Sequence, residues 1–171
     1  MKLILKLILG LIVTGYVVRL SKAQDITVFV PKGPIVIDVM AGLIWMRCSI
    51  GQVWENEKCD GTPILAPLAV TKTIIARTTS SMGDGWRLPT RNELQRLVVD
   101  QTNPPMINQD IFSETHPGIY WSSDQNRLVP NNFWVINFFT GHSYGRARGN
   151  QNLAIRYEQE RCAAQLGARY F

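Results

Sequence analysis

The sequence predicts an α+β fold, in which helices and strands occupy separate parts of the chain. Short β-branched segments come first, two helical patterns follow in the middle, and a group of short strand-like segments comes last. Strands do not alternate with helices, as they would in a parallel α/β sheet. We therefore expect two short helices packed on a small antiparallel sheet with long loops.

Residues 1–23 are typical of a secretory signal peptide. Lys2 and Lys6 precede an apolar run over residues 7–18, and Ser21-Lys22-Ala23 supplies small residues around a cleavage point after Ala23. A retained membrane anchor is the alternative, although crossing a bilayer takes about 20 apolar residues. We expect export to the periplasm or the outer cell surface, with no integral membrane segment after cleavage.

The net charge argues against a nucleic-acid-binding role. The chain has 18 basic and 13 acidic residues, a formal net charge of +5. Four of the 18 basic residues lie in residues 1–23, which leaves 14 against 13 and a net charge of +1. Binding to nucleic acid needs a basic excess on the folded part of a protein. The 148 residues after position 23 suit a single domain.

The first part of that domain predicts three strands and a disulfide. Residues 25–39 favour two short strands around a turn, and residues 42–48 favour a third. Cys48 and Cys59 enclose a polar loop that a disulfide can close, a stabilisation of roughly 3 kcal/mol. Cys162 is left over, either as a buried thiol, as a link to another chain, or as the true partner of one of the two.

Two helices are expected in the middle of the chain. Residues 66–79 form the first pattern, with Pro67 tolerated in the first turn. Its expected buried side consists of Leu68, Thr71, Ile75 and Ala76. The second pattern, residues 91–99, follows a threonine N-cap at position 90 and places Leu94, Leu97 and Val98 on one apolar face.

The stretch "GWRLPTRNELQRL", residues 85–97, is interpreted as scaffold for the second helix. Thr90 and Glu93 have the spacing of a capping box, in which each side chain binds the other residue's backbone N–H. Trp86 and Leu88 are expected in the core. Arg87 is expected to anchor an ion pair, and its candidate partners are Asp84, Asp100 and Asp110.

Four short strands are expected after the helices. Glycine, asparagine and proline separate segments 118–123, 131–141, 142–149 and 152–157, and a hairpin turn is expected around Gly141. These segments complete the antiparallel sheet of the predicted α+β fold.

Several motifs occur together in a fixed order: "GLIWMRCSIGQVWENEKCDG", "GDGWRLPTRNEL", "YWSS", "FWVINFFTG" and "LAIRY". In this set the chain resembles the Lcl C-terminal domain family, which is named for the end of a Legionella collagen-like adhesin. The resemblance covers about residues 36–157, between a lead-in at 24–35 and an extension at 158–171. Its structural motif residues here are Trp86, Arg87, Leu88, Pro89, Thr90, Glu93 and Trp121.

The resemblance implies a C-type-lectin-like fold and a non-enzymatic role in adhesion. The founding member implies attachment to sulfated polysaccharides, whereas other relatives resemble envelope or pilus-associated proteins. The expected partner is therefore an anionic polysaccharide or an envelope or pilus protein. An accessory or assembly factor that acts through protein contacts is the alternative function.

An enzyme is the less favoured interpretation. The Trp-Arg-Leu-Pro-Thr motif followed by Glu also resembles formylglycine-generating enzymes, but those need a reactive thiol pair in the C-terminal part, where this chain has Cys162 alone. His116 and His142 have no visible nucleophile partner. Neither a calcium loop nor a zinc-ligand spacing is present, so no cofactor or metal is expected.

The best candidate for a ligand-binding surface lies in "HSYGRARGNQN". If residues 143–148 form a strand, Tyr144, Arg146 and Arg148 point to one side. Forked guanidinium groups suit sulfate or phosphate, and an aromatic ring can pack against sugar. Arg127, in a loop before Pro130, is expected to extend this patch. The alternative is a solvated hairpin face that keeps a sheet edge soluble.

Overall fold

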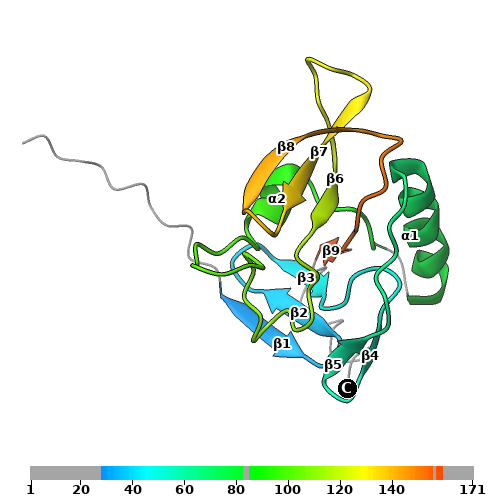
Figure 1. Ribbon diagram of the computed structural model, residues 1–171. Helices are drawn as coiled ribbons and strands as arrows, with labels where there is room; N and C mark the ends of the chain where they lie inside the picture. Colours follow the sequence, from blue (N-terminus) through cyan, green and yellow to red (C-terminus); the bar gives the residue numbers. More distant parts are fainter. Residues whose placement is uncertain (1–27, 83–84, 156, 160–171) are drawn as a thin grey trace, which may run out of the picture.

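The structure, a computed structural model, describes residues 28–82, 85–155 and 157–159 (Figure 1). The predicted signal peptide at 1–23 and Cys162 lie outside the described residues. Within those residues, no helix has the length and apolar character that a membrane crossing requires.

A four-stranded antiparallel sheet lies at one end of the molecule, with strand order β1-β2-β3-β9 (Figure 1). The predicted pair of strands around a turn is confirmed, and Gly33 in that turn has a φ of +55°, which glycine adopts without strain. The expected third strand is also present, next to the second. The strands are β1 (Phe29–Lys32), β2 (Ile35–Asp38), β3 (Leu43–Met46) and β9 (Tyr157–Gln159).

The predicted disulfide between Cys48 and Cys59 is present, with the two Cα atoms 5.3 Å apart. It joins the end of β3 to a small hairpin of β4 (Val53–Glu55) and β5 (Lys58–Asp60). The two-residue turn of this hairpin consists of Asn56 and Glu57, both with positive φ, as the turn that matches strand twist requires.

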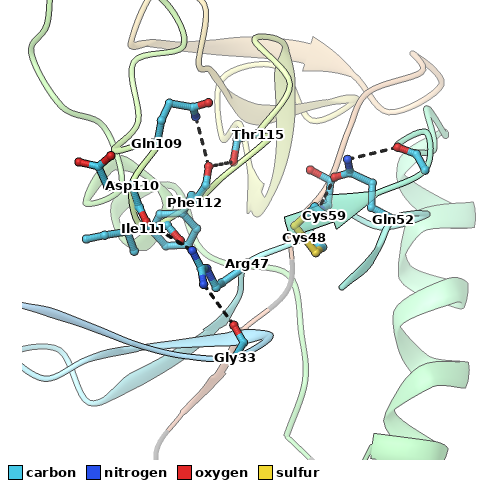
Figure 2. Close-up of a disulfide and its surroundings, with 12 residues drawn as sticks. Gly33, Arg47, Cys48, Gln52, Cys59, Gln109, Asp110, Ile111, Phe112 and Thr115 are labelled. Carbon is cyan, nitrogen blue, oxygen red and sulfur yellow. Dashed lines mark hydrogen bonds between the residues drawn. A yellow bond between two sulfur atoms is a disulfide. The ribbon is translucent and has the colours of Figure 1, made fainter. Parts of the chain in front are cut away.

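Arg47 holds the disulfide region against two loops (Figure 2). Its guanidinium donates to the carbonyl oxygens of Ile111, at 2.6 Å, and Gly33, at 3.4 Å. The same group lies 4.2 Å from the centre of the Trp54 ring. The side chain before Cys48 therefore connects the β1–β2 turn, the β4–β5 hairpin and the loop around residue 111.

The first helix, α1 (Leu68–Met82), confirms the predicted helix with later bounds. Leu68, Thr71 and Ile75 are buried as expected, but Ala76 is exposed, so its predicted place on the buried side was wrong. Position 76 lies beyond the edge of the stripe that 68, 71 and 75 define, and the partly buried Ile74 flanks that stripe instead.

The second helix, α2 (Arg91–Gln95), begins with the predicted capping box. The Thr90 N–H and hydroxyl donate to the Glu93 carboxylate at 2.7 and 2.8 Å, and the hydroxyl accepts from the Glu93 N–H. The helix is shorter than the predicted 91–99. Its last turn tightens to hydrogen bonds between residues three apart, because Val98 must pair with Ile107 in an isolated bridge.

Arg87 forms its ion pair with Glu93, a carboxylate that the sequence assigned only to the cap. The guanidinium binds both oxygens of Glu93, at 3.0 and 3.2 Å. Neither Asp100 nor Asp110 has this role, and Asp84 lies outside the described residues. Glu93 was not among the predicted partners because it already had a role in the cap. A carboxylate has enough acceptor sites to bind both the Thr90 N–H and a forked guanidinium.

The second antiparallel sheet has the order β6-β7-β8, from β6 (Ile119–Gln125), β7 (Asn132–Asn137) and β8 (His142–Ala147). The hairpin turn around Gly141 is confirmed, with φ of +73°. The fourth predicted strand, 152–157, does not join this sheet as a strand. It makes single bridges from Asn152 to Ala66 and from Leu153 to Tyr120, and then enters the first sheet as β9. This segment therefore connects the two sheets.

The core lies on both faces of the β6–β8 sheet. Tyr120 and Ile136 face the largest buried cluster, which also contains Leu94 of α2. Their neighbours Trp121 and Val135 face a second cluster that includes residues of α1. Trp86, Leu88 and Trp121 are buried, as the scaffold interpretation predicted. The observed architecture is mixed α+β, as expected.

A buried ion pair links α2 to the first sheet. Asp38, at the end of β2, is 0% exposed and accepts from Arg96 Nε at 3.0 Å and from Arg96 Nη2 at 3.2 Å. The Ala41 N–H donates to the same carboxylate at 3.1 Å. A carboxylate this deeply buried is tolerated because it is paired and hydrogen-bonded.

Removing the guanidinium of this pair should destabilise the fold strongly. We expect Arg96→Met to lower the free energy of unfolding by about 3–5 kcal/mol, because Asp38 is then buried without its countercharge. Arg77→Met, at an exposed position of α1, is the matched control and should change stability by no more than about 0.5 kcal/mol. Urea unfolding measures both. Equal stability of the two variants would contradict a structural role for the pair.

Removing the helix cap should cost less. Thr90→Ala is expected to lower the free energy of unfolding by about 1 kcal/mol, because the Glu93 N–H loses its acceptor. Thr90→Ser keeps the oxygen and should retain most of that stability. Thermal and denaturant unfolding check the order wild type, Ser, Ala. An unchanged stability in Thr90→Ala would show that the cap is not what starts α2.

Candidate functional site

A pocket of about 640 Å³ lies at one end of the β6–β8 sheet. The start of α2, the end of β6, the β6–β7 loop and the middle of β7 surround it. The loop projects from the sheet at the top of Figure 1, in yellow, with α2 behind β8. The lining residues are Arg91, Asn92, Ser123, Asp124, Gln125, Asn126, Arg127, Leu128 and Trp134.

Asn126 gives the β6–β7 loop its shape. Its side-chain oxygen accepts from the backbone N–H groups of Leu128, at 3.0 Å, and Val129, at 3.3 Å, as in the turns that asparagine commonly starts. Its own N–H donates to the Asn132 carbonyl at 2.8 Å and so closes the base of the loop. The loop therefore presents Arg127 and Leu128 at its tip, where Leu128 is 93% exposed.

Arg91 is the most tightly positioned cation of the pocket. Its guanidinium lies over the Trp134 ring, 4.1 Å from the ring centre. Its Nε donates to the Ser143 hydroxyl of β8 at 2.9 Å, and its backbone N–H donates to the Asp124 carboxylate at 2.9 Å. No acceptor for its two terminal amino groups is found in the part of the chain that the structure describes. The forked end of Arg91 is thus fixed in place and open to a ligand.

The other lining side chains are mainly neutral and polar. Asp124 is the single acidic residue of the lining, and one of its oxygens is already bound to the Arg91 backbone. Asn92 brings an amide group that can bind hydroxyls as donor or acceptor. The amides of Gln125 and Asn126 are partly used within the loop, through the Pro130 carbonyl and the Leu128 and Val129 N–H groups, and keep their remaining donors or acceptor. With Arg91 and Arg127 as the basic residues, the lining carries more positive than negative charge.

The four residues predicted to bind ligand are divided between two faces. Arg127 lines the pocket. Tyr144 packs against the second core cluster, on the α1 side of the sheet, so its ring is half-buried. Arg146 also lies half-buried on β8, with its Nε buried and without a partner among the described residues. Arg148 follows the end of β8 and is exposed, its N–H bonded to the Asn131 carbonyl.

Sequence reasoning missed Arg91 and Trp134 as site residues, although both carried a usable signal. Phe133 and Val135 are apolar neighbours of Trp134 on β7, and alternation along a strand places Trp134 on the opposite face from them. Arg91 is the first residue after the capping threonine, which fixes it at the start of α2. The sequence did not indicate that the first residue of α2 lies against β7 and β8.

Within 28–82, 85–155 and 157–159, no group of three or more His, Cys, Asp and Glu side chains has a metal-binding arrangement. His116 and His142 are both exposed.

The model of one protein family, described as the Lcl C-terminal domain, matches residues 34–157. This chain belongs to the Lcl C-terminal domain family. The match covers most of the chain and includes every residue that lines the pocket. A comparison with curated proteins gives no match. Membership in this family indicates a surface adhesin-like module, and the Cys48–Cys59 disulfide agrees with an oxidising environment outside the cytoplasm.

Proposed function

We propose that this Lcl C-terminal domain is a non-catalytic, exported module that binds an anionic polysaccharide in the pocket between α2 and the β6–β7 loop. The observation that carries this proposal is the state of Arg91. Its guanidinium is held by Trp134 and Ser143, while its terminal amino groups have no acceptor among the described residues.

A fixed guanidinium suits sulfate or carboxylate for a geometric reason. Two parallel N–H donors match two oxygens of such an anion, and a bond with charge on both sides is about twice as strong as a neutral one. Because Trp134 and Ser143 already restrain Arg91, little side-chain entropy is lost when the anion binds. Arg127 supplies a second positive charge on the opposite, loop side of the same pocket.

The amide groups of the pocket favour a sugar polymer over a simple anion. Asn92 and Gln125 lie beside the two cations and can bind hydroxyl groups, which inorganic sulfate lacks. A polymer also brings several charges past the pocket in one chain. Its binding is therefore expected to weaken as salt rises, because exposed charges are screened over about 10 Å at 0.1 M salt.

Binding to chondroitin sulfate, compared with unsulfated chondroitin, tests this proposal. The double variant Arg91→Ala with Arg127→Ala should bind the sulfated polymer at least about tenfold more weakly, which corresponds to about 1.4 kcal/mol. The affinity of Arg91→Lys should lie between those of the wild type and the double variant, because lysine keeps the positive charge but lacks the two parallel N–H donors of a guanidinium. Isothermal titration at two salt concentrations measures each affinity.

Two matched controls locate the site. Arg77→Ala removes an exposed charge of α1 and should bind like the wild type. The pair Arg146→Ala with Arg148→Ala tests the surface that the sequence had favoured. A loss confined to that pair would place the binding surface on the α1 side of the sheet. Equal binding of sulfated and unsulfated polymer would reject a preference for sulfate, and binding that neither salt nor the Arg91 and Arg127 double variant weakens would reject anion recognition altogether.

A protein partner is the second candidate, and Leu128 favours it. Leu128 is 93% exposed at the loop tip and so offers apolar surface that a partner protein can bury. An envelope or pilus accessory role predicts that Leu128→Ser abolishes the contact while the arginine double variant keeps it. Polysaccharide binding predicts that the arginine double variant loses affinity for chondroitin sulfate while Leu128→Ser keeps it. Cross-linking to purified envelope proteins and titration with chondroitin sulfate, each with both variants, therefore separate the two functions.

A further inference from the structure

Asp124 is the one residue of the Arg91 pocket whose charge opposes the binding of an anion. It is the single acidic residue of the lining, which also contains Arg91 and Arg127. Like charges brought together in a binding site cost affinity, so a carboxylate here lowers the attraction of the pocket for any anion. The size of that effect depends on which groups of the ligand lie next to the carboxylate.

One oxygen of Asp124 is used within the fold and the other is not. Oδ2 accepts from the Arg91 backbone N–H at 2.9 Å. The Asp124 N–H donates to the Ser122 hydroxyl at 3.2 Å, and that hydroxyl donates to the Trp134 carbonyl at 2.8 Å. Oδ1 has no hydrogen-bond partner among the described residues and is not one of their buried unpaired atoms, so it is open to solvent. The carboxylate is thus fixed through one oxygen and presents the other.

The charges of Asp124 and Arg91 are not cancelled by an ion pair between them. Within the described residues, the Asp124 carboxylate is paired with neither Arg91 nor Arg127. Trp134 and Ser143 hold the Arg91 guanidinium instead, at 4.1 Å from the ring centre and 2.9 Å from the hydroxyl oxygen. A ligand in this pocket therefore meets a fixed guanidinium and a separate carboxylate oxygen, each with its charge available.

We infer that Asp124 restricts the pocket to sugar units that carry a single anionic group, an inference that rests on the proposed polysaccharide function. A sulfate bound by Arg91 brings the rest of its sugar into the pocket, where a hydroxyl can donate to Asp124 Oδ1. A second sulfate on the same sugar has no proton to donate and brings like charge against the carboxylate. Selection of this kind comes from a repulsive element and not from added attraction.

The hydrogen bond from Asp124 to α2 does not require its negative charge. An asparagine oxygen accepts a backbone N–H at a helix start about as well as an aspartate oxygen does. Negative charge near a helix start is favourable, but Glu93 already supplies a carboxylate to the first turn of α2. The charge of Asp124 therefore adds little to the start of this helix.

A metal ion does not fit as the partner of Asp124. Hard cations such as calcium take six to eight oxygen ligands, several of them from carboxylates. Within 28–82, 85–155 and 157–159, no group of three or more His, Cys, Asp and Glu side chains is arranged to hold a metal, and Asp124 is the single carboxylate of this lining. The ligand group that Asp124 Oδ1 suits is a neutral donor such as a hydroxyl.

Two chondroitin sulfate chains of equal length and equal charge test the inference. Both carry two sulfates per disaccharide, either both on the N-acetylgalactosamine or one on each sugar. The wild-type protein should bind the first chain at least about tenfold more weakly, because only that chain brings a second sulfate of the same sugar against Asp124. Isothermal titration measures both affinities, with the chain that carries one sulfate per disaccharide as the reference.

Three variants show whether the charge of Asp124 makes the selection. Asp124→Asn removes the charge but keeps an acceptor for the Arg91 N–H, and its affinities for the two isomeric chains should agree within about twofold. Asp60→Asn is the matched control, because it removes the same charge from an exposed position of β5, at the other end of the molecule (Figure 1). Thr90→Ala weakens the start of α2 without changing a charge. Both controls should keep the full difference between the chains.

The outcomes separate this inference from the proposed function. Equal affinity of the wild type for the two isomeric chains, or a difference that persists in Asp124→Asn, would overturn the inference, while the proposed function stands if the reference chain still binds through Arg91. Loss of the difference in Thr90→Ala would also contradict it, since the position of α2 and not the charge would then make the selection. If no sulfated chain binds, the proposed function fails and the inference fails with it.

Discussion

The buried pair of Asp38 and Arg96 is the interaction on which the arrangement of this domain depends. A helix of five residues, such as α2, is too short to be stable by itself, and its position must come from contacts at its ends. At the C-terminal end, Arg96 reaches the carboxylate at the end of β2 and so fixes α2 to the first sheet. Because one partner is fully buried, alternative positions of the helix would leave a charge unpaired in the core.

The other end of α2 is fixed to the second sheet. The Thr90–Glu93 cap starts the helix, and Arg87 binds the same carboxylate. The first helical N–H then donates to Asp124 of β6. The helix is therefore a cross-link between the two sheets, and the Arg91 side chain is carried to Trp134 as a consequence. The capping residue Thr90 and the candidate binding residue Arg91 are adjacent in the sequence because the helix start that the cap fixes also positions the Arg91 side chain.

The candidate site lies at one end of the β6–β8 sheet. Near the β6–β7 loop, Arg91 and Arg127 supply charge and a fixed fork. Loops and chain crossings collect at strand ends, where the backbone is not used in the ladder, so binding groups gather there and not along the strands.

The sequence by itself determined the features that short-range chemistry controls. The turn at Gly141 and the Thr90 cap follow from residues close together in the chain, whose spacing sets their geometry, and the order of the segments indicated the α+β class. The sequence favoured a Cys48–Cys59 disulfide but left Cys162 as an alternative partner, and the structure decided for the first pairing. Only the tertiary structure decided which carboxylate pairs with which arginine and which strands residues 152–157 contact. It also placed Tyr144 and Arg127 on different faces of the sheet and put the Arg91 guanidinium over the Trp134 ring. Those outcomes join segments that are far apart in sequence, and they depend on which apolar faces pack together and not on any local pattern.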